Sequence, residues 1–275
     1  MNFEPKISII IVNYNGQDFL TDCLDSVLKS DYPDFEVILV DNNSSDDSIN
    51  IVKNKFSQVK IIINKKNLGF ARANNIGIKQ AIGDAIFLLN NDTVIDPQLI
   101  KRLVSELFKT ENIGIVGPKI YFANTENIIW FAGGKIDWEN FNSWHIARNK
   151  TDQNLAGDVL REVDFITGCA LMIKKEVVNK IGLLDNKFFA YYEDADWCLR
   201  AKKAGYKVMY IPFGGVWHIK SATARRYSSY RLKYNLWRNR FIFYWRYAPK
   251  KYRIKLLMKY IRSIIKKLFL KIYVK

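Results

Sequence analysis

The chain has 275 residues, 49% of them hydrophobic, which suits one large α/β domain or two small ones with a tail and excludes a disordered or fibrous protein. Its formal net charge of +16 is concentrated at one end, because all 27 acidic residues lie at or before Asp196 and 22 of the 43 lysines and arginines follow it. A mildly acidic body with a strongly basic end indicates a polyanionic partner, either anionic lipid or nucleic acid.

The N-terminal stretch has no basic region followed by a long apolar run and a cleavage site, so its short apolar run predicts a strand and not a signal peptide. No segment approaches the ~18 apolar residues of a membrane span. Three cysteines without a CxxC pair, Cys23, Cys169 and Cys198, predict small buried side chains in a reducing compartment. We therefore expect a cytoplasmic body.

The first 92 residues alternate β-branched apolar runs with helical patterns. Strands are expected at 7–12, 35–40, 59–63 and 85–89, with a helical stretch that ends near Lys29 and a helix at 71–82. Short apolar strands that alternate with helices predict a mostly parallel central sheet covered on both faces. Polar clusters at 13–16, 41–46 and 90–92 follow three of these strands, and ligands of open α/β sheets bind at that edge.

Residues 93–224 have a mixed pattern, with a helix expected at 97–108, a strand at 170–173, and a helix that begins near Asp194 and ends before Gly205. No linker separates this half from the first. The chain contains neither a GxGxxG nor a GxxxxGK[ST] loop, so a Rossmann dehydrogenase or a P-loop NTPase is not supported.

Five segments together resemble family 2 inverting glycosyltransferases of the GT-A fold, and most closely their rhamnosyltransferase-like branch. The segments are SIIIVNYNG at 8–16, VDNNSSDDS at 40–48, NLGFARANNIG at 67–77, LLNNDT at 88–93 and FFAYYEDADWCLRAKKAGY at 188–206. The resemblance covers about residues 6–240. It implies a GT-A domain at 1–224, with a nucleotide-sugar half at 1–92 and an acceptor half at 93–224. Beyond about Arg225 the composition changes to aromatic and basic residues, which predicts a basic amphipathic helical tail at 225–275.

By the same resemblance, eight residues are expected to bind the nucleotide-sugar donor: Val12, Tyr14, Asp41, Asn43, Asn67, Gly69, Asn74 and Asn91. Other interpretations stay open from the residues alone. Asp41 is also typical of a turn aspartate that bonds its own backbone, and the two asparagines at 67 and 74 of a helix cap. Gly69 permits a tight turn before a helix whose free N–H groups suit a diphosphate.

Asn90-Asn91-Asp92 stands in the place of the family's DxD motif, and only its last position keeps a carboxylate. Asp92 is therefore the candidate ligand of a divalent cation, Mg²⁺ or Mn²⁺, with a turn residue as the alternative. His218 matches the position of a histidine that completes metal coordination in several relatives. A lone histidine is otherwise more often structural, and imidazole is softer than Mg²⁺ prefers.

Glu193 and Asp194 precede a helix, where acidic residues also serve as caps and stabilise the helix dipole. The resemblance assigns Asp194 the role of the base that deprotonates the acceptor hydroxyl, with Glu193 in reserve. Asp196 is expected to orient the site or to pair with Arg200, four residues further along the helix. Trp130, Trp138 and Trp144 are expected to pack, with sugar platforms as the alternative, and His145 has no assigned role.

The tail places apolar residues on one helical face and basic residues on the other, a pattern typical of a helix that lies on an anionic membrane. The apolar set is Leu257, Ile261, Ile264, Ile265, Leu268 and Ile272, and the basic set is Lys255, Lys259, Arg262 and Lys266. Packing of this helix on the domain is the alternative. Nucleic-acid binding ranks below a membrane, because the body resembles a sugar enzyme.

The sequence therefore predicts an inverting, metal-dependent glycosyltransferase that moves rhamnose or another hexose from a dTDP- or UDP-sugar to a lipid-linked or glycan acceptor, peripherally on the inner face of the cell membrane. Two other classes remain: a non-catalytic membrane- or nucleic-acid-binding protein, and a sugar nucleotidyltransferase.

Overall fold

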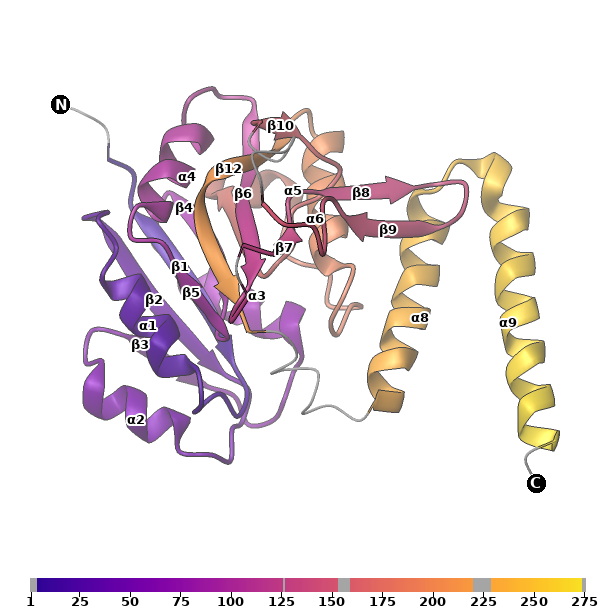
Figure 1. Cartoon of the computed structure of the whole chain (residues 1–275), viewed down its shortest axis with the longest axis horizontal. Coiled ribbons are helices and arrows are strands. Elements are labelled where there is room, and N and C mark those ends of the chain that lie inside the picture. Colours follow the sequence, from indigo (N-terminus) through magenta and orange to yellow (C-terminus); the bar gives the residue numbers. More distant parts are fainter. Residues whose placement is uncertain (1–3, 126, 153–158, 220–228, 274–275) are drawn as a thin grey trace.

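The structure is a computed structural model in which residues 4–125, 127–152, 159–219 and 229–273 are described. Within them, ten strands form one sheet in the order β10-β12-β6-β11-β4-β1-β2-β3, with β5 on β12 and β7 on β6 (Figure 1). β8 and β9 form a separate hairpin. The strands are β1 (Ile7–Asn13), β2 (Phe35–Asp41), β3 (Lys60–Ile63), β4 (Ala85–Asn90), β5 (Thr93–Ile95), β6 (Ile113–Phe122), β7 (Ile129–Phe131), β8 (Gly134–Asp137), β9 (Asn142–His145), β10 (Arg161–Glu162), β11 (Ala170–Lys174) and β12 (Lys207–His218).

Helices cover the sheet, and the three predicted at 71–82, at 97–108 and from Asp194 to before Gly205 begin and end within two residues of the prediction. The helices are α1 (Leu20–Leu28), α2 (Ser48–Lys55), α3 (Phe70–Gln80), α4 (Leu99–Leu107), α5 (Lys175–Ile181), α6 (Glu193–Lys203), α8 (Ser229–Tyr247), the 3₁₀ turn η1 (Lys250–Tyr252) and α9 (Arg253–Tyr273). Of these, α2 and α5 were not predicted. Pro97 lies outside α4, because Leu99 N–H donates to the carbonyl of Asp96 in a turn that precedes the helix. Gly205, with φ of +93°, follows the end of α6 as predicted.

The four strands of the first half are parallel, as the sequence predicts, since β1 pairs with β2 and β4 and β2 pairs with β3. Their register aligns Asn13 with Asp41 and Val12 with Asn90, so the three polar clusters meet at one edge of the sheet. β11 runs antiparallel to β4 and joins the second half to the same sheet. The fold is thus α/β with a mixed, mostly parallel central sheet flanked by helices.

β12 carries the chain back to this edge. It runs parallel to β6 with a register shift between Ile211 and Gly215, and its last residues also pair antiparallel with β5. That second pairing sets His218 opposite Thr93, directly after Asp92. The shared sheet explains why the sequence shows no linker between the halves. All three cysteines are buried and free, as predicted.

The tail forms two long helices that lie side by side, with the β8–β9 hairpin reaching toward them (Figure 1). α8 packs on the body, because Phe243 and Tyr244 are fully buried in the common core and contact Trp138 of the hairpin. The tail is therefore not a separate unit along its whole length, and α9 leaves an apolar face exposed. The predicted boundary between residues 224 and 225 lies outside the described residues. Within the described chain, no helix is both long and apolar enough to cross a membrane.

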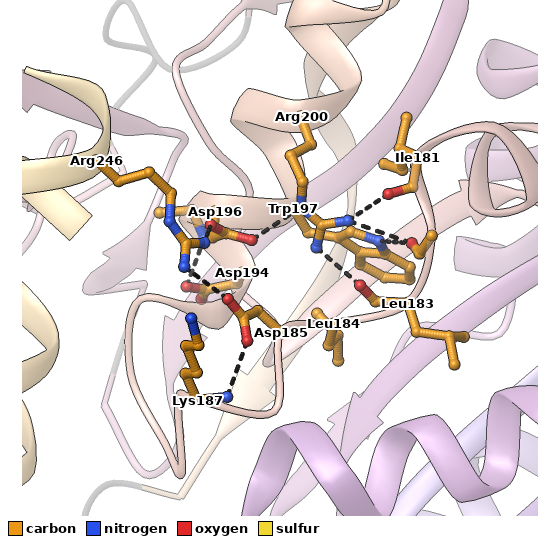
Figure 2. A network of polar contacts seen from close by, with 12 residues as sticks. Ile181, Leu183, Leu184, Asp185, Lys187, Asp194, Asp196, Trp197, Arg200 and Arg246 are labelled. Atoms are coloured by element: carbon orange, nitrogen blue, oxygen red, sulfur yellow. Dashed lines mark hydrogen bonds and ion pairs between the residues drawn. The ribbon is translucent and has the colours of Figure 1, made fainter. Parts of the chain in front are cut away.

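Asp196 of α6 anchors α8 to the body (Figure 2). Its buried carboxylate accepts hydrogen bonds from Arg200 Nε at 2.9 Å, Arg246 Nη1 at 2.6 Å and the Tyr247 hydroxyl at 2.7 Å. The pairing of Asp196 with Arg200 confirms the sequence prediction. Arg246 also donates to Asp185 at 2.8 Å, so one arginine of α8 joins α6 to the loop that precedes it.

Candidate functional site

A cavity of about 730 Å³ opens where β1 and β4 end and α6 begins. Its lining comes from both halves of the sheet, from the β8–β9 hairpin, from the loop before α6 and from α8. The predicted site residues in the lining are Val12, Tyr14, Asn91, Asp92, Glu193, Asp194 and His218. Asp92 and His218 are 126 positions apart in the sequence and thus line the same cavity only in the folded chain.

Asp92 follows β4 and is only 1% exposed. Its Oδ1 atom lies 3.3 Å from Nε2 of His218 and accepts no hydrogen bond from the described residues. The strand pairing explains the approach, since Ile219 N–H donates to the main-chain carbonyl of Asp92 at 2.9 Å. A buried carboxylate oxygen without a hydrogen-bond donor is costly unless a positive charge or a proton compensates it.

These two side chains fit a divalent cation. Two ligands of one ion with bonds of ~2.1 Å can lie at most ~4.2 Å apart, so a 3.3 Å separation of Asp92 Oδ1 and His218 Nε2 is within reach of a shared ion. Among the described residues, no group of three or more His, Cys, Asp or Glu side chains gathers as a complete metal site. Protein ligands alone therefore leave most of the coordination shell to water or to a bound phosphate.

Asp194 lies in the first turn of α6 and is held by two backbone amides. Its Oδ2 accepts a hydrogen bond from Gly168 N–H at 2.9 Å, and its Oδ1 accepts one from Ala195 N–H at 2.8 Å. The close approach of Gly168 depends on its missing side chain, because a Cβ there would lie 2.9 Å from the Phe70 ring. These contacts fix the direction of the carboxylate.

The neighbouring carboxyls differ in their surroundings. Burial, followed by repulsion from Asp194, raises the pKa of Glu193 well above its usual value, and its Oε2 atom has no hydrogen-bond partner among the described residues. Burial also raises the pKa of Asp194, but the amides of Gly168 and Ala195 oppose that rise. Of the two, Asp194 is the better supported as an anion, which is what a general base requires.

Among the residues expected to bind the donor, Asn91 is connected to β1, because its Nδ2 donates to Asn13 Oδ1 at 2.7 Å. Val12 and Tyr14 lie on either side of Asn13 and line the same cavity. Asn42, which the sequence analysis missed, also lines it and connects two loops by donating to the Gly69 carbonyl and accepting from Leu68 N–H.

Five predicted donor residues do not line the cavity: Asp41, Asn43, Asn67, Gly69 and Asn74. Asp41 is the turn aspartate that the residues alone allowed, because its oxygens accept from Asn13 Nδ2 and from the backbone N–H of Ser44. Asn67 Oδ1 accepts from Gly69 N–H, and Asn74 Nδ2 donates within α3 to the Phe70 carbonyl. These bonds shape the loops around the site.

Gly69 has φ of +80° and ψ of −178°, a conformation that is essentially restricted to glycine. A Cβ there would lie 2.5 Å from the carbonyl oxygen of Phe189. That same oxygen accepts a hydrogen bond from Phe70 N–H at 2.7 Å. The first N–H of α3, expected to face a diphosphate, is therefore bonded to the loop before α6.

The structure adds an aromatic group to the cavity lining. Trp130 packs between two imidazoles, with ring centroids 4.7 Å from His218 and 4.6 Å from His145, and all three line the cavity. Burial, followed by repulsion from Arg148, lowers the pKa of His145 to about 4, so this ring is neutral at pH 7. No local sequence pattern predicts this group, because β7 and β9 bring the side chains of Trp130 and His145 together only in the folded chain.

Of the other tryptophans, Trp144 lines the cavity at 46% exposure, whereas Trp138 packs in the core against Phe243, as expected.

Comparisons with known proteins agree with this arrangement. The chain is 29% identical over 219 residues to the poly-beta-1,6-N-acetyl-D-glucosamine synthase of Staphylococcus epidermidis, a match covering 79% of this chain and 50% of that protein. It is 28% identical over 229 residues to the O-antigen biosynthesis protein RfbC of Myxococcus xanthus, covering 80% of this chain and 18% of that protein. The chain thus spans half or less of the length of these curated relatives.

Solved structures share the fold. GalNAc-T7 with UDP, GalNAc and Mn²⁺ superposes with a TM-score of 0.66 at 21% identity, covering 80% of this chain and 44% of that one. The mannosyltransferase PcManGT of Pyrobaculum calidifontis, in complex with GDP-Man and Mn²⁺, gives 0.65 at 17% identity over 94% of this chain and 70% of that one. The model of the family described as "Glycosyl transferase family 2" matches residues 8–182, and the chain belongs to that family.

Proposed function

We propose that the cavity transfers a sugar from a nucleotide-sugar to a hydroxyl of a glycan or lipid-linked acceptor, with inversion at the anomeric carbon. One observation carries the proposal: Asp92, His218 and Asp194 line the same cavity. An in-line displacement needs a base on the acceptor side and positive charge on the leaving-group side; Asp194 would supply the base, and Asp92 and His218 would hold the cation that supplies the charge.

Asp194 is the proposed base. The amides of Gly168 and Ala195 hold its carboxylate in place, so the proton of the acceptor hydroxyl meets a fixed oxygen. The burial that raises its pKa makes it a stronger base than an aspartate in water. Glu193, whose pKa is raised further, is suited to remain protonated and to donate a hydrogen bond to a sugar oxygen.

Asp92 and His218 are the proposed holders of a divalent cation. A bound cation would neutralise the negative charge that the departing nucleoside diphosphate gains. The imidazole favours Mn²⁺ over Mg²⁺ in this ligand set. GalNAc-T7 and PcManGT were both crystallised with Mn²⁺, which supports the proposal by analogy of fold.

The donor proposal is a nucleoside diphosphate sugar, with dTDP-rhamnose and UDP-linked hexoses as candidates. TarS of S. aureus, a structural neighbour with a TM-score of 0.61, was solved with UDP-GlcNAc, and PcManGT with GDP-Man. The names of the curated relatives refer to polysaccharide and O-antigen synthesis, which supports a glycan acceptor in cell-surface polysaccharide biosynthesis.

We also propose that α9 rests on the anionic inner face of the cell membrane. Six apolar side chains of this helix are 38–73% exposed: Ile254, Leu257, Met258, Ile261, Ile264 and Ile265. Lys259 donates to the Asn140 carbonyl and Lys255 lies 3.7 Å from Glu139, so part of the basic face contacts the β8–β9 turn. The side chains of Lys266, Leu268 and Ile272 lie outside the described part of α9.

The test of the enzymatic proposal is a donor screen with dTDP-rhamnose, UDP-GlcNAc and GDP-mannose, with Mn²⁺ and lipid-extract acceptors, scored by nucleoside diphosphate release and by the anomeric configuration of the product. We expect an inverted product and a ~10²- to 10⁴-fold loss of transfer in Asp194→Asn, which keeps the shape of the side chain but removes the base. Release of pyrophosphate, or a retained configuration, would contradict the proposal.

The metal proposal has a readout that is independent of turnover. In the wild type, Mn²⁺ should raise the affinity for the matching nucleoside diphosphate measured by calorimetry, because Asp92 and His218 would hold a positive charge next to the phosphates. Asp92→Asn should abolish that increase while Mn²⁺-free binding stays the same. An equal Mn²⁺ effect in both proteins would show that the ion binds elsewhere.

A further inference from the structure

α8 forms hydrogen bonds with the loop that leads into α6, the helix that carries Asp194. Asn239 lies in the middle of α8 and is fully buried. Its Nδ2 group donates to two consecutive main-chain carbonyls of the loop, those of Ala190 at 2.9 Å and Tyr191 at 3.1 Å. Ala190, Tyr191 and Tyr192 all line the cavity.

Arg238 fixes the orientation of this amide. Its Nη1 donates to Asn239 Oδ1 at 3.0 Å and to the Lys187 carbonyl at 2.9 Å. With Oδ1 taken by the guanidinium, the Nδ2 group is directed at the loop. Adjacent residues of α8 thus bind carbonyls at both ends of the segment 187–191.

The loop needs such support because its backbone is unusual. Tyr191 and Tyr192 both have φ of +74°, in the left-handed region that bulky side chains rarely occupy. Tyr192 is the N-cap of α6, so its conformation sets the direction in which Glu193 and Asp194 leave the loop. The Tyr192 ring also packs on Phe243 of α8, at 5.1 Å between ring centroids.

We infer that α8 belongs to the acceptor side of the site. Asn239 is a positioning residue, which holds residues 190–192 so that Asp194 faces the cavity. This rests on the proposed function, in which Asp194 is the base. The donor side depends on β1 and β4, and the hydrogen bonds of Asn239 go to Arg238 and to the loop before α6, not to these strands. Loss of the Asn239 bonds therefore impairs transfer more than it impairs donor binding.

The test is Asn239→Asp, which keeps the shape of the side chain and the oxygen that accepts from Arg238. The substitution replaces the Nδ2 group, which donates to the carbonyls of Ala190 and Tyr191, with an oxygen that cannot donate to them. The matched control is Asn235→Asp, the same change one turn earlier on α8, at a side chain that makes no hydrogen bond to the described residues. We expect Asn239→Asp to lower kcat for transfer by about 10- to 100-fold, as small misplacements of a catalytic group do. Affinity for nucleoside diphosphate with Mn²⁺ should change less than twofold, and the control should match the wild type in both.

Amide hydrogen exchange of the segment 186–194 gives a second readout that needs no turnover. Faster exchange there in Asn239→Asp, but not in Asn235→Asp, supports the inference, and unchanged exchange or an unchanged kcat overturns it. If the wild type transfers no sugar, the proposed function fails, and the exchange comparison alone decides whether Asn239 orders the loop.

Arg238→Met provides a second variant should Asn239→Asp not fold. It removes the bonds to Asn239 and Lys187 at a partly exposed position and leaves the Asn239 donors in place. A smaller loss of kcat, with donor affinity unchanged, is expected. A parallel loss of kcat and donor affinity would show general destabilisation and overturn the inference.

Discussion

Asp196→Asn tests how α6 and α8 are joined. The carboxylate is 0% exposed and accepts hydrogen bonds from Arg200, Arg246 and Tyr247 at 2.6–2.9 Å. An asparagine of the same shape keeps one neutral acceptor but removes the charge that the two arginines face.

Breaking a buried ion pair on one side costs ~3–5 kcal/mol, and we take the lower end, about 3 kcal/mol, because water screens the partners. The side chain of Arg246 is 32% exposed and that of Arg200 is 23% exposed. For a domain of this size, about 3 kcal/mol corresponds to a fall in Tm of about 6–12 °C.

The assay is urea unfolding together with calorimetric Tm. Asp22→Asn is the matched control, since Asp22 is also an acidic residue in the first turn of a helix but is exposed. A double-mutant cycle with Arg246→Met should give a coupling energy of about 1 kcal/mol or more between Asp196 and Arg246. If Asp196→Asn loses no more stability than Asp22→Asn, the network does not hold α8 to the body.

Three further predictions concern the proposed base, the turn at Gly69 and the exposed face of α9. Because burial raises the pKa of Asp194 and the base must be ionised, the acid limb of the kcat/KM profile should lie at higher pH than an ordinary aspartate gives, and a limb at or below pH ~4 would contradict this. Gly69→Ala should destabilise the fold by about 2 kcal/mol or more, measured by urea unfolding, because its conformation excludes a Cβ and the Phe189 carbonyl lies in the way; Gly205→Ala, where a Cβ has open space, should cost less. The pair Ile261→Asp and Ile265→Asp should weaken binding to phosphatidylglycerol vesicles more than about 100-fold in a flotation assay, whereas Ile82→Asp, 73% exposed on the body, should leave binding unchanged.

Local sequence was sufficient to predict the sheet edge at which the cavity opens. The apolar runs of β1, β2 and β4 have the length and composition of buried parallel strands, and the polar residues that follow them must then meet at one edge. Asp92, Asn91 and Tyr14 were predicted to lie there on that basis, and the structure places all three in the cavity lining.

Side-chain roles within those loops were harder to predict. Asp41 and Asn74 were assigned to the donor, yet both are bonded within the protein and neither lines the cavity. The same side-chain atoms of asparagine and aspartate can stabilise a turn, cap a helix or bind a ligand. Only the directions of their hydrogen bonds in the folded protein distinguish these roles.

The sequence by itself determined the strands β1–β4 and β11, the turns at Gly69 and Gly205 and the acidic start of α6, because these depend on neighbours within a few residues. Only the tertiary structure decided which distant side chains share the site. His218 reaches Asp92 through the pairing of β12 with β5, Trp130 and His145 meet through β7 and β9, and Asn239 bonds a loop 48 residues earlier in the chain. Such contacts depend on strand register and helix packing, which no local periodicity encodes.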